Sequence, residues 1–261
     1  MGKLKLGILG NGYLADIIVE AGLKGMLDEY ELVGVLGRTR EKTELLAKKG
    51  GCRACSTIDE LLAPAPDYVA EAASVQSVKD CGVKILASGA SMIVLSIGAF
   101  ADKEFYGQVK ETAAVHGTRV YIASGAVGGF DVLRTISLMG QAEAGIRTKK
   151  GPASLKGTPL FEERLMEDTQ ESHVFHGNAK EAISLLPTKV NVAVASSLAT
   201  VGPEDTRVDI YSVPGMVGDD HKITSQIEGV KAVVDIYSST SAIAGWSVVA
   251  VLQNIVSPIV F

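Results

Sequence analysis

A glycine pattern near the start of the chain constrains the fold more than any other feature. Gly10, Gly12 and Ala15 follow a short apolar run, Leu4 to Leu9, and precede Asp16 to Leu27, where apolar residues recur at helical spacing. Gly10 permits a tight turn, Gly12 leaves the backbone open to a ligand, and Ala15 allows close helix–strand packing. This order predicts a Rossmann unit, in which the helix N-terminus binds the pyrophosphate of a dinucleotide.

The first half of the chain continues this alternation of apolar runs and amphipathic helices. Near-continuous apolar strands are buried on both faces, as in a parallel sheet covered by helices. We therefore predict an α/β fold in which residues 1–125 form a dinucleotide-binding Rossmann domain with a doubly wound parallel sheet. The predicted strands are Leu4 to Leu9, Leu32 to Leu36, Tyr68 to Ala72, Met92 to Ile97 and Arg119 to Ala123.

The pattern changes after Gly129, where strand candidates outnumber helices. We predict a C-terminal α+β domain over residues 126–240, with a mixed or antiparallel sheet and a role in catalysis and dimerisation. The final helix, within residues 241–261, can return to pack on the first domain. The predicted strands are Ala142 to Thr148, Ser172 to Gly177, Asn191 to Ala195, Arg207 to Ser212, His221 to Glu228 and Val230 to Tyr237.

Composition excludes several classes of partner. The net charge is −5 and no basic block stands out, so we expect no nucleic-acid partner. The apolar stretch Ala242 to Ile255 contains Gly245 and Gln253, and we interpret it as a buried helix rather than a membrane span. The three cysteines and the absence of a signal-peptide pattern predict a cytoplasmic protein. Cys52 and Cys55 form a C-x-x-C pair without a nearby histidine, so we expect no metal.

The end of the second predicted strand bears on the choice of cofactor. An NAD-selective site usually has an acidic residue here, which accepts from the ribose 2′-hydroxyl. This chain has Gly37 followed by Arg38, Thr39 and Arg40. Because a guanidinium can bind a 2′-phosphate bidentately, we favour NADP over NAD. The alternative is that Arg38 and Arg40 are solvated residues at a helix start.

The other predicted strand ends lie at the same edge of the sheet and carry small or polar residues. By position, the cofactor-binding candidates are Gly10, Asn11, Gly12, Tyr13, Leu14, Arg38, Thr39, Ala73, Ser96 and Gly98.

One of the four histidines is a candidate acid–base group. His221 follows a glycine-rich, acidic turn, Pro214 to Asp220, and precedes a predicted strand. A histidine on a loop edge beside carboxylates can exchange protons near neutral pH. His116, His173 and His176 fit ordinary surface or strand positions.

Five segments of the chain form a pattern that is typical of one enzyme family. In chain order they are Leu95 to Asp102, Ser124 to Leu133, Phe175 to Ala182, Leu186 to Ala193 and Asp219 to Ile223. In order and spacing they resemble the L-aspartate dehydrogenases, most specifically in Ser-Gly-Ala-x-Gly-Gly and Asn-Val-Ala. The resemblance implies NAD(P)-dependent oxidative deamination of L-aspartate to iminoaspartate, and hence oxaloacetate and ammonia, or the reverse reductive amination. It also implies acid–base catalysis by His221, cofactor contacts by Ala126 and Asn191, and a homodimer.

The substrate implied is a small amino or oxo dicarboxylic acid, whose carboxylates need cations or N–H donors. Arg134, Lys149, Lys150 and Lys189 are the charges available near the matching segments, and the sequence does not choose among them.

The chain departs from the family pattern in two places. The family usually has Asn-x-His-x-Ile where this chain has Asp219 to Ile223, and we expect the added carboxylate to favour protonated His221. Of the family's Pro-Ser-x-x-Asn-Pro-Lys-Thr-Ser stretch, Asp235 to Ser241 keeps only Thr-Ser. The second departure leaves open an NADP-dependent imine or keto reductase acting on another small amino or oxo acid. A non-catalytic dinucleotide-binding redox sensor is a further alternative.

Overall fold

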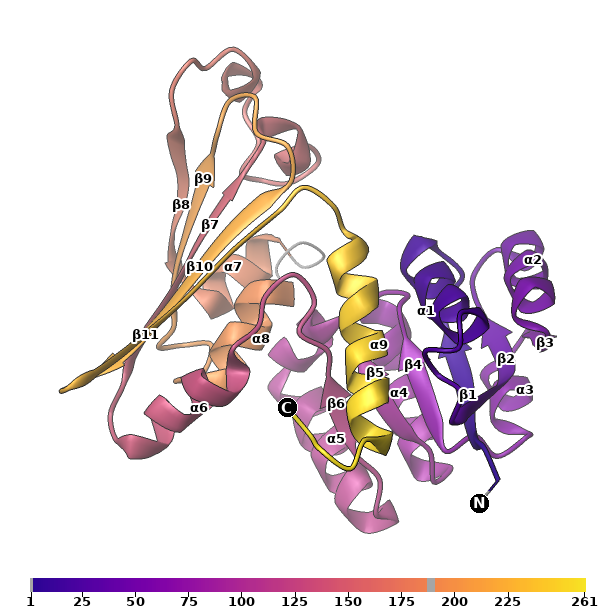
Figure 1. The fold of residues 1–261 in the computed structure, drawn as a ribbon. Coiled ribbons are helices and arrows are strands. Elements are labelled where there is room, and N and C mark those ends of the chain that lie inside the picture. The colour runs from indigo at the N-terminus through magenta and orange to yellow at the C-terminus, as the bar shows by residue number, and fades with distance from the viewer. Residues whose placement is uncertain (1, 187–190) are drawn as a thin grey trace. The chain divides into compact units, whose positions relative to one another are not determined.

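A computed structural model describes residues 2–186 and 191–261, and the chain divides into two compact units (Figure 1). Unit 1 comprises Met1–Gly125 and Ala242–Phe261, and unit 2 comprises Ala126–Ser241. Among the described residues, none of the helices combines the length and hydropathy that a membrane span needs.

Unit 1 contains a six-stranded sheet in which every pairing is parallel. The strand order, β3-β2-β1-β4-β5-β6, is that of a Rossmann fold, so the predicted N-terminal fold class is confirmed. The sequence predicted five strands, because β3 has three residues and no apolar run to reveal it. The strands are β1 (Leu4–Leu9), β2 (Tyr30–Leu36), β3 (Arg53–Cys55), β4 (Tyr68–Glu71), β5 (Ser91–Val94) and β6 (Val120–Ile122).

Helices cover both faces of this sheet. Leu6 and Ile8 of β1 pack in one core with Ile18 and with Val248 and Leu252 near the C-terminus. Each such fully buried side chain contributes about 1.5–3 kcal/mol. Gly7, between them, faces Leu61 on the other side. The helices are α1 (Tyr13–Leu23), α2 (Arg40–Gly50), α3 (Ile58–Leu62), α4 (Val75–Ala87), α5 (Lys103–His116) and α9 (Ala242–Val256), with a 3-10 turn, η1 (Ile97–Ala101).

Strand β5 is shorter than predicted. The sequence suggested a strand through Ile97, but pairing stops at Val94 and the chain enters η1. The reason is local: the N–H groups of Leu95 and Ser96 donate to the side chain of Glu71 instead of to a neighbouring strand.

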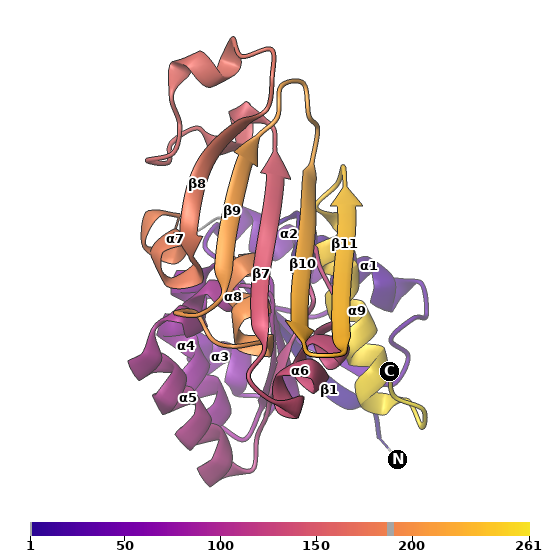
Figure 2. The ribbon, with the colours of Figure 1, turned by 90° about the vertical axis from the view of Figure 1, so that its left-hand side faces the viewer.

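Unit 2 contains a five-stranded mixed sheet in the order β11-β10-β7-β9-β8 (Figure 2). The β7–β9 pairing is parallel and the other pairings are antiparallel. The sheet is therefore mixed, one of the two arrangements that the sequence predicted. The strands are β7 (Glu143–Lys150), β8 (Ser172–Asn178), β9 (Arg207–Ser212), β10 (Asp219–Ile227) and β11 (Val230–Ser238). The helices are α6 (Phe130–Met139), α7 (Ala179–Leu185) and α8 (Asn191–Ala199), with 3-10 turns η2 (Pro152–Leu155) and η3 (Glu163–Met166).

The predicted strand Asn191 to Ala195 is wrong, because these residues begin helix α8. The alternation of valine and alanine imitates a strand, yet five consecutive residues, 193–197, are buried. Burial on several sides of a short helix removes the helical period from the sequence. The helix also carries local side-chain bonds, such as that from the Ser196 hydroxyl to the Val192 carbonyl at 2.8 Å.

The two faces of the unit 2 sheet differ. Ile146 and Thr148 on β7 and His221 on β10 face the side on which α6 and α8 lie. Arg147 and Asp209 alternate with these buried residues and point to the other side, where no helix lies in front of the strands in Figure 2. We call this second side the open face.

Helix α9 packs against α1 through a glycine. A Cβ added at Gly245 would lie 2.9 Å from Ile17 Cδ1 and 3.1 Å from Ile17 Cβ. Such distances leave no room for a larger side chain without displacing one of the two helices.

We therefore predict that Gly245→Val lowers the free energy of unfolding by about 1–3 kcal/mol through overpacking. The matched control is Ala250→Val, an exposed position on the same helix, for which we expect less than about 1 kcal/mol from helix propensity. Urea denaturation of both variants measures the difference, and equal losses would contradict close α1–α9 packing.

Candidate functional site

The carboxyl edge of the unit 1 sheet is built around Gly10. Its φ is +135°, and a Cβ there would lie 2.4 Å from the Ala72 carbonyl oxygen, so only glycine fits. Its N–H donates to the Leu36 carbonyl at 2.7 Å. The loop after β1 is thus held between the ends of β2 and β4, the point at which the strand order reverses.

Gly12 leaves the start of α1 accessible. It occupies the N-cap position and has no side chain to cap the first-turn N–H groups. A Cβ added there would meet nothing within 4 Å. Tyr13 and Leu14 begin the helix, and Tyr13 is 59% exposed. An uncapped helix start with open space before it fits an anion such as a pyrophosphate.

The side chain of Asn11 connects the loop after β1 to the segment that begins α2. Its side-chain N–H donates to the Thr39 carbonyl at 2.8 Å and to the Thr43 hydroxyl at 2.9 Å. A Cβ on Gly37 would lie 2.3 Å from the Asn11 side chain, so glycine is required there also. From the sequence we expected Asn11 only as a cofactor contact. In the structure its side chain also holds the loop that carries Arg38 and Thr39.

The two arginines of that loop differ. Arg40 bonds to Glu44 at 2.6 Å and to the Ser56 hydroxyl. Arg38 is exposed and makes no hydrogen bond or ion pair with any residue that the structure describes. Arg38 is therefore the guanidinium available to a ligand, next to Thr39 at the N-cap of α2.

Glu71 ties the next two strand ends together. Its buried carboxylate accepts from the N–H of Ala73 at 2.8 Å, of Leu95 at 3.1 Å and of Ser96 at 2.9 Å. The Ser96 hydroxyl also donates to it, at 2.7 Å. Burial raises the pKa of Glu71, while these four donors act in the opposite direction. Ala73 and Ser96 are thus brought together, and Gly98 follows within the buried turn η1.

His221 lies inside a strand rather than on the loop edge that the sequence suggested. It is the third residue of β10 and is 5% exposed. Its Nδ1 lies 3.0 Å from the hydroxyl of Thr148, its cross-strand partner on β7. The turn that precedes it ends earlier, because Asp219 and Asp220 already pair with β7. Sequence reasoning missed Thr148, which only the strand register reveals.

The added carboxylate acts on His221 in the expected direction, but burial outweighs its effect. Burial lowers the pKa of His221 to about 4. Asp219 raises this pKa, as expected, but Lys150 lowers it, so burial decides the outcome. The imidazole is therefore neutral at pH 7.

A small apolar pocket with two polar neighbours surrounds His221. Lys150, whose side chain is 10% exposed, lies 3.5 Å from Asp219. The pocket is lined by Thr148, Lys150, Leu155, Leu186, Val192, Ala193, Val208, Ile210 and His221.

The sequence offered four cationic residues as candidates to bind a substrate carboxylate. Of these four, Lys150 lines the same pocket as His221. Lys149 points to the open face and forms an ion pair with Glu171. Arg134 is exposed on α6, and Lys189 lies outside the described residues. Ala126 stands in a turn after β6 and Asn191 begins α8, and both belong to unit 2.

Comparisons with known proteins identify both halves of the chain. The family model "Aspartate dehydrogenase, C-terminal" matches residues 131–255, and "Homoserine dehydrogenase, NAD binding domain" matches residues 6–123. The second match shows that unit 1 is a dinucleotide-binding domain.

Relatives match over nearly the whole length. An L-aspartate dehydrogenase of Methanococcus maripaludis is 33% identical over 98% of both chains. One from Methanocaldococcus jannaschii is 29% identical over the same shares. The crystal structure of aspartate dehydrogenase from Thermotoga maritima is 27% identical, with a TM-score of 0.79 over 99% of both chains. With this identity and coverage, the chain belongs to the L-aspartate dehydrogenase family.

Proposed function

We propose that this protein is an NAD(P)-dependent amino-acid dehydrogenase that interconverts L-aspartate and iminoaspartate, which water converts to oxaloacetate and ammonia. The observation that carries the proposal is the buried, neutral His221 beside Lys150, in a chain whose relatives are named L-aspartate dehydrogenases. The reaction needs a proton acceptor near the amine and a cation for a carboxylate, and this pocket has both.

Unit 1 would hold the cofactor. Gly10, Gly12 and the first turn of α1, with Tyr13 and Leu14, would bind the pyrophosphate through backbone N–H groups. Bound NAD(P)⁺ supplies the hydride acceptor. Asn11 would act indirectly, by holding the loop that bears Arg38.

The remaining cofactor contacts follow from position. Ala73, Ser96 and Gly98 lie at the ends of β4 and β5, where Glu71 orders the backbone, and they would accommodate a flat ring. Ala126 and Asn191 keep the proposed role of cofactor contacts that family resemblance assigns to them.

We propose NADP as the preferred cofactor. Arg38 is exposed, has no competing carboxylate in the described residues, and stands beside the N-terminus of α2. A 2′-phosphate would gain from both the guanidinium and the helix dipole.

His221 would act as the general base through Nε2. In that tautomer Nδ1 would carry the proton and donate a hydrogen bond to the Thr148 hydroxyl, 3.0 Å away, which would hold the ring in place. Because burial keeps the imidazole neutral, it can take a proton from the substrate ammonium and later help water to add to the imine. Lys150 would bind a substrate carboxylate, held in position by Asp219 until the substrate arrives.

We also propose that the enzyme is a cytoplasmic homodimer. The three free cysteines fit a reducing compartment. Exposed apolar side chains on α6, such as Leu138 and Met139, are suited to contact a second copy.

We predict that Arg38→Asp raises KM for NADP at least about tenfold, since a charge-assisted pair of hydrogen bonds is lost, and leaves KM for NAD nearly unchanged. Arg40→Asp is the matched control, because Arg40 is already paired with Glu44 and should affect selectivity less. Steady-state kinetics with both cofactors test this. A wild-type enzyme that prefers NAD would contradict the assignment.

We predict that His221→Gln lowers kcat for L-aspartate by about 100-fold or more, the usual effect of removing a general base. NADPH binding, followed by fluorescence, should persist and report that the variant is folded. His116→Gln, at an exposed helix end, is the control. The assignment of L-aspartate as the substrate would be refuted if wild type formed no NADPH with aspartate and consumed no NADPH with oxaloacetate and ammonia.

We predict that Lys150→Met raises KM for L-aspartate by about 10–100-fold, because a charge-assisted bond worth about 1.5–3 kcal/mol is lost. Lys149→Met is the matched control, since the neighbouring lysine points to the open face. Equal effects of the two substitutions on KM would rule out a specific role for Lys150.

A further inference from the structure

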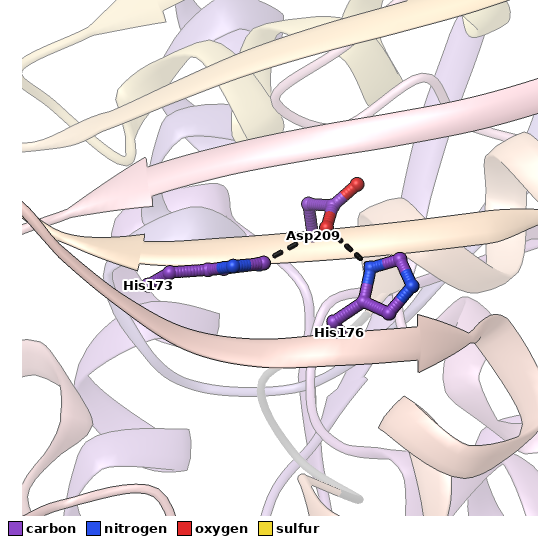
Figure 3. A group of neighbouring side chains, drawn as sticks. All are labelled: His173, His176 and Asp209. Atoms are coloured by element: carbon purple, nitrogen blue, oxygen red, sulfur yellow. Dashed lines mark hydrogen bonds and ion pairs between the residues drawn. The ribbon is translucent and has the colours of Figure 1, made fainter.

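Two histidines and an aspartate gather on the open face of the unit 2 sheet (Figure 3). His173 and His176 come from β8, and Asp209 comes from the adjacent strand β9. The Asp209 Oδ1 atom lies 3.0 Å from His173 Nε2 and 2.8 Å from His176 Nδ1. Three atoms able to ligate a metal thus lie within 4.8 Å of one another.

A β-bulge brings the histidines together. In a regular strand, residues three apart point to opposite faces. Here the register shifts between His173 and Phe175, so that His173 pairs with Tyr211 and His176 with Asp209. Tyr211 and Asp209 are two apart and share a face. The extra residue in β8 therefore turns both imidazoles toward Asp209, as bulges do where a side chain must be redirected.

The cluster is ordered and accessible. The His173 ring stacks on Tyr211, with centroids 4.4 Å apart and an angle of 10° between the planes. The side chains of His173 and His176 are 40% and 66% exposed. An ion could therefore enter from solvent, and the rings need little ordering when it binds.

We propose that His173, His176 and Asp209 form a binding site for a divalent transition-metal cation of the Zn²⁺ class, with water in the fourth position. Two imidazoles and a carboxylate are a ligand set that such ions accept. In a tetrahedral site with bonds of about 2.0 Å, ligand atoms stand about 3.3 Å apart. The observed 2.8 and 3.0 Å separations from Asp209 need to open by only a few tenths of an ångström. The two imidazole nitrogens lie within 4.8 Å of each other, so that they need to approach by at most about 1.5 Å to reach the tetrahedral spacing.

The neighbouring cations do not occupy the site. Lys149 lies over the Tyr211 ring and is paired with Glu171. Arg147 is opposite Asp209 in the β7–β9 register. The pKa of Asp235 is lowered first by its hydrogen bond with Lys222 and least by the charge of Arg147. No ion pair joins Arg147 to Asp209 among the described residues. The Asp209 carboxylate therefore faces the two histidines.

The site departs from the sequence expectation of no metal, which rested on Cys52 and Cys55. Those thiols remain poor ligands, because burial raises the pKa of Cys52 to about 11 and keeps it protonated at neutral pH. The histidine site would instead join β8, the edge strand of the sheet, to β9. Zn²⁺ bound there would hold the edge strand in place and raise the melting temperature.

Calorimetric titration of the full-length, tag-free protein with ZnCl₂ tests the proposal. We expect one ion per chain and at least about tenfold weaker binding for His176→Ala and for Asp209→Asn. Zn²⁺ should raise the melting temperature of wild type but not of these two variants. His116→Ala and Cys52→Ser are matched controls and should titrate as wild type does.

Circular dichroism verifies that the exposed variants remain folded. Zn²⁺ binding that is equally strong in His176→Ala, or is lost in Cys52→Ser, would overturn the proposal. A stoichiometry of one ion per two chains would also overturn it, because the three ligands come from a single chain.

Discussion

The buried carboxylate of Glu71 is the interaction on which the cofactor edge of unit 1 depends. Removing a charged group from water costs several kcal/mol unless donors replace its hydration. Three backbone N–H groups and the Ser96 hydroxyl replace it here. Because these donors belong to the loops after β4 and β5, compensation of the charge also fixes the path of both loops. On the neighbouring side, Gly10 packs against the Ala72 carbonyl, so the loop after β1 is held by the same strand end.

In unit 2 the corresponding constraint is the alternation of side chains along the strands. Thr148 and His221 share one face with apolar residues, and burial there gives His221 its low pKa. Asp209 lies on the opposite face, where His176 stays in water. One sheet thus offers two chemical environments: a dry one in which an imidazole is a neutral base, and a wet one in which imidazoles can bind a cation.

Much of this fold could be predicted from the sequence, since long apolar runs and glycine turns act locally. The Rossmann strands and the Gly10 turn are of this kind. What could not be predicted depends on register or burial. The Val-Ala alternation of α8 imitates a strand, the Thr148–His221 pair requires the β7–β10 register, and the bulge in β8 leaves no mark on the i, i+3 spacing of His173 and His176.

The effect of Asp219 on the pKa of His221 is opposed by a neighbouring residue. Where the family usually has asparagine, this chain has a carboxylate, which by itself would favour a protonated His221. Asp219 instead faces Lys150 across the β7–β10 pair at 3.5 Å, and the lysine acts on His221 in the opposite sense. Since the two charges oppose each other, burial sets the protonation state. The residue that departs from the family pattern is therefore an ion-pair partner of Lys150 and leaves His221 neutral, the state that a general base requires.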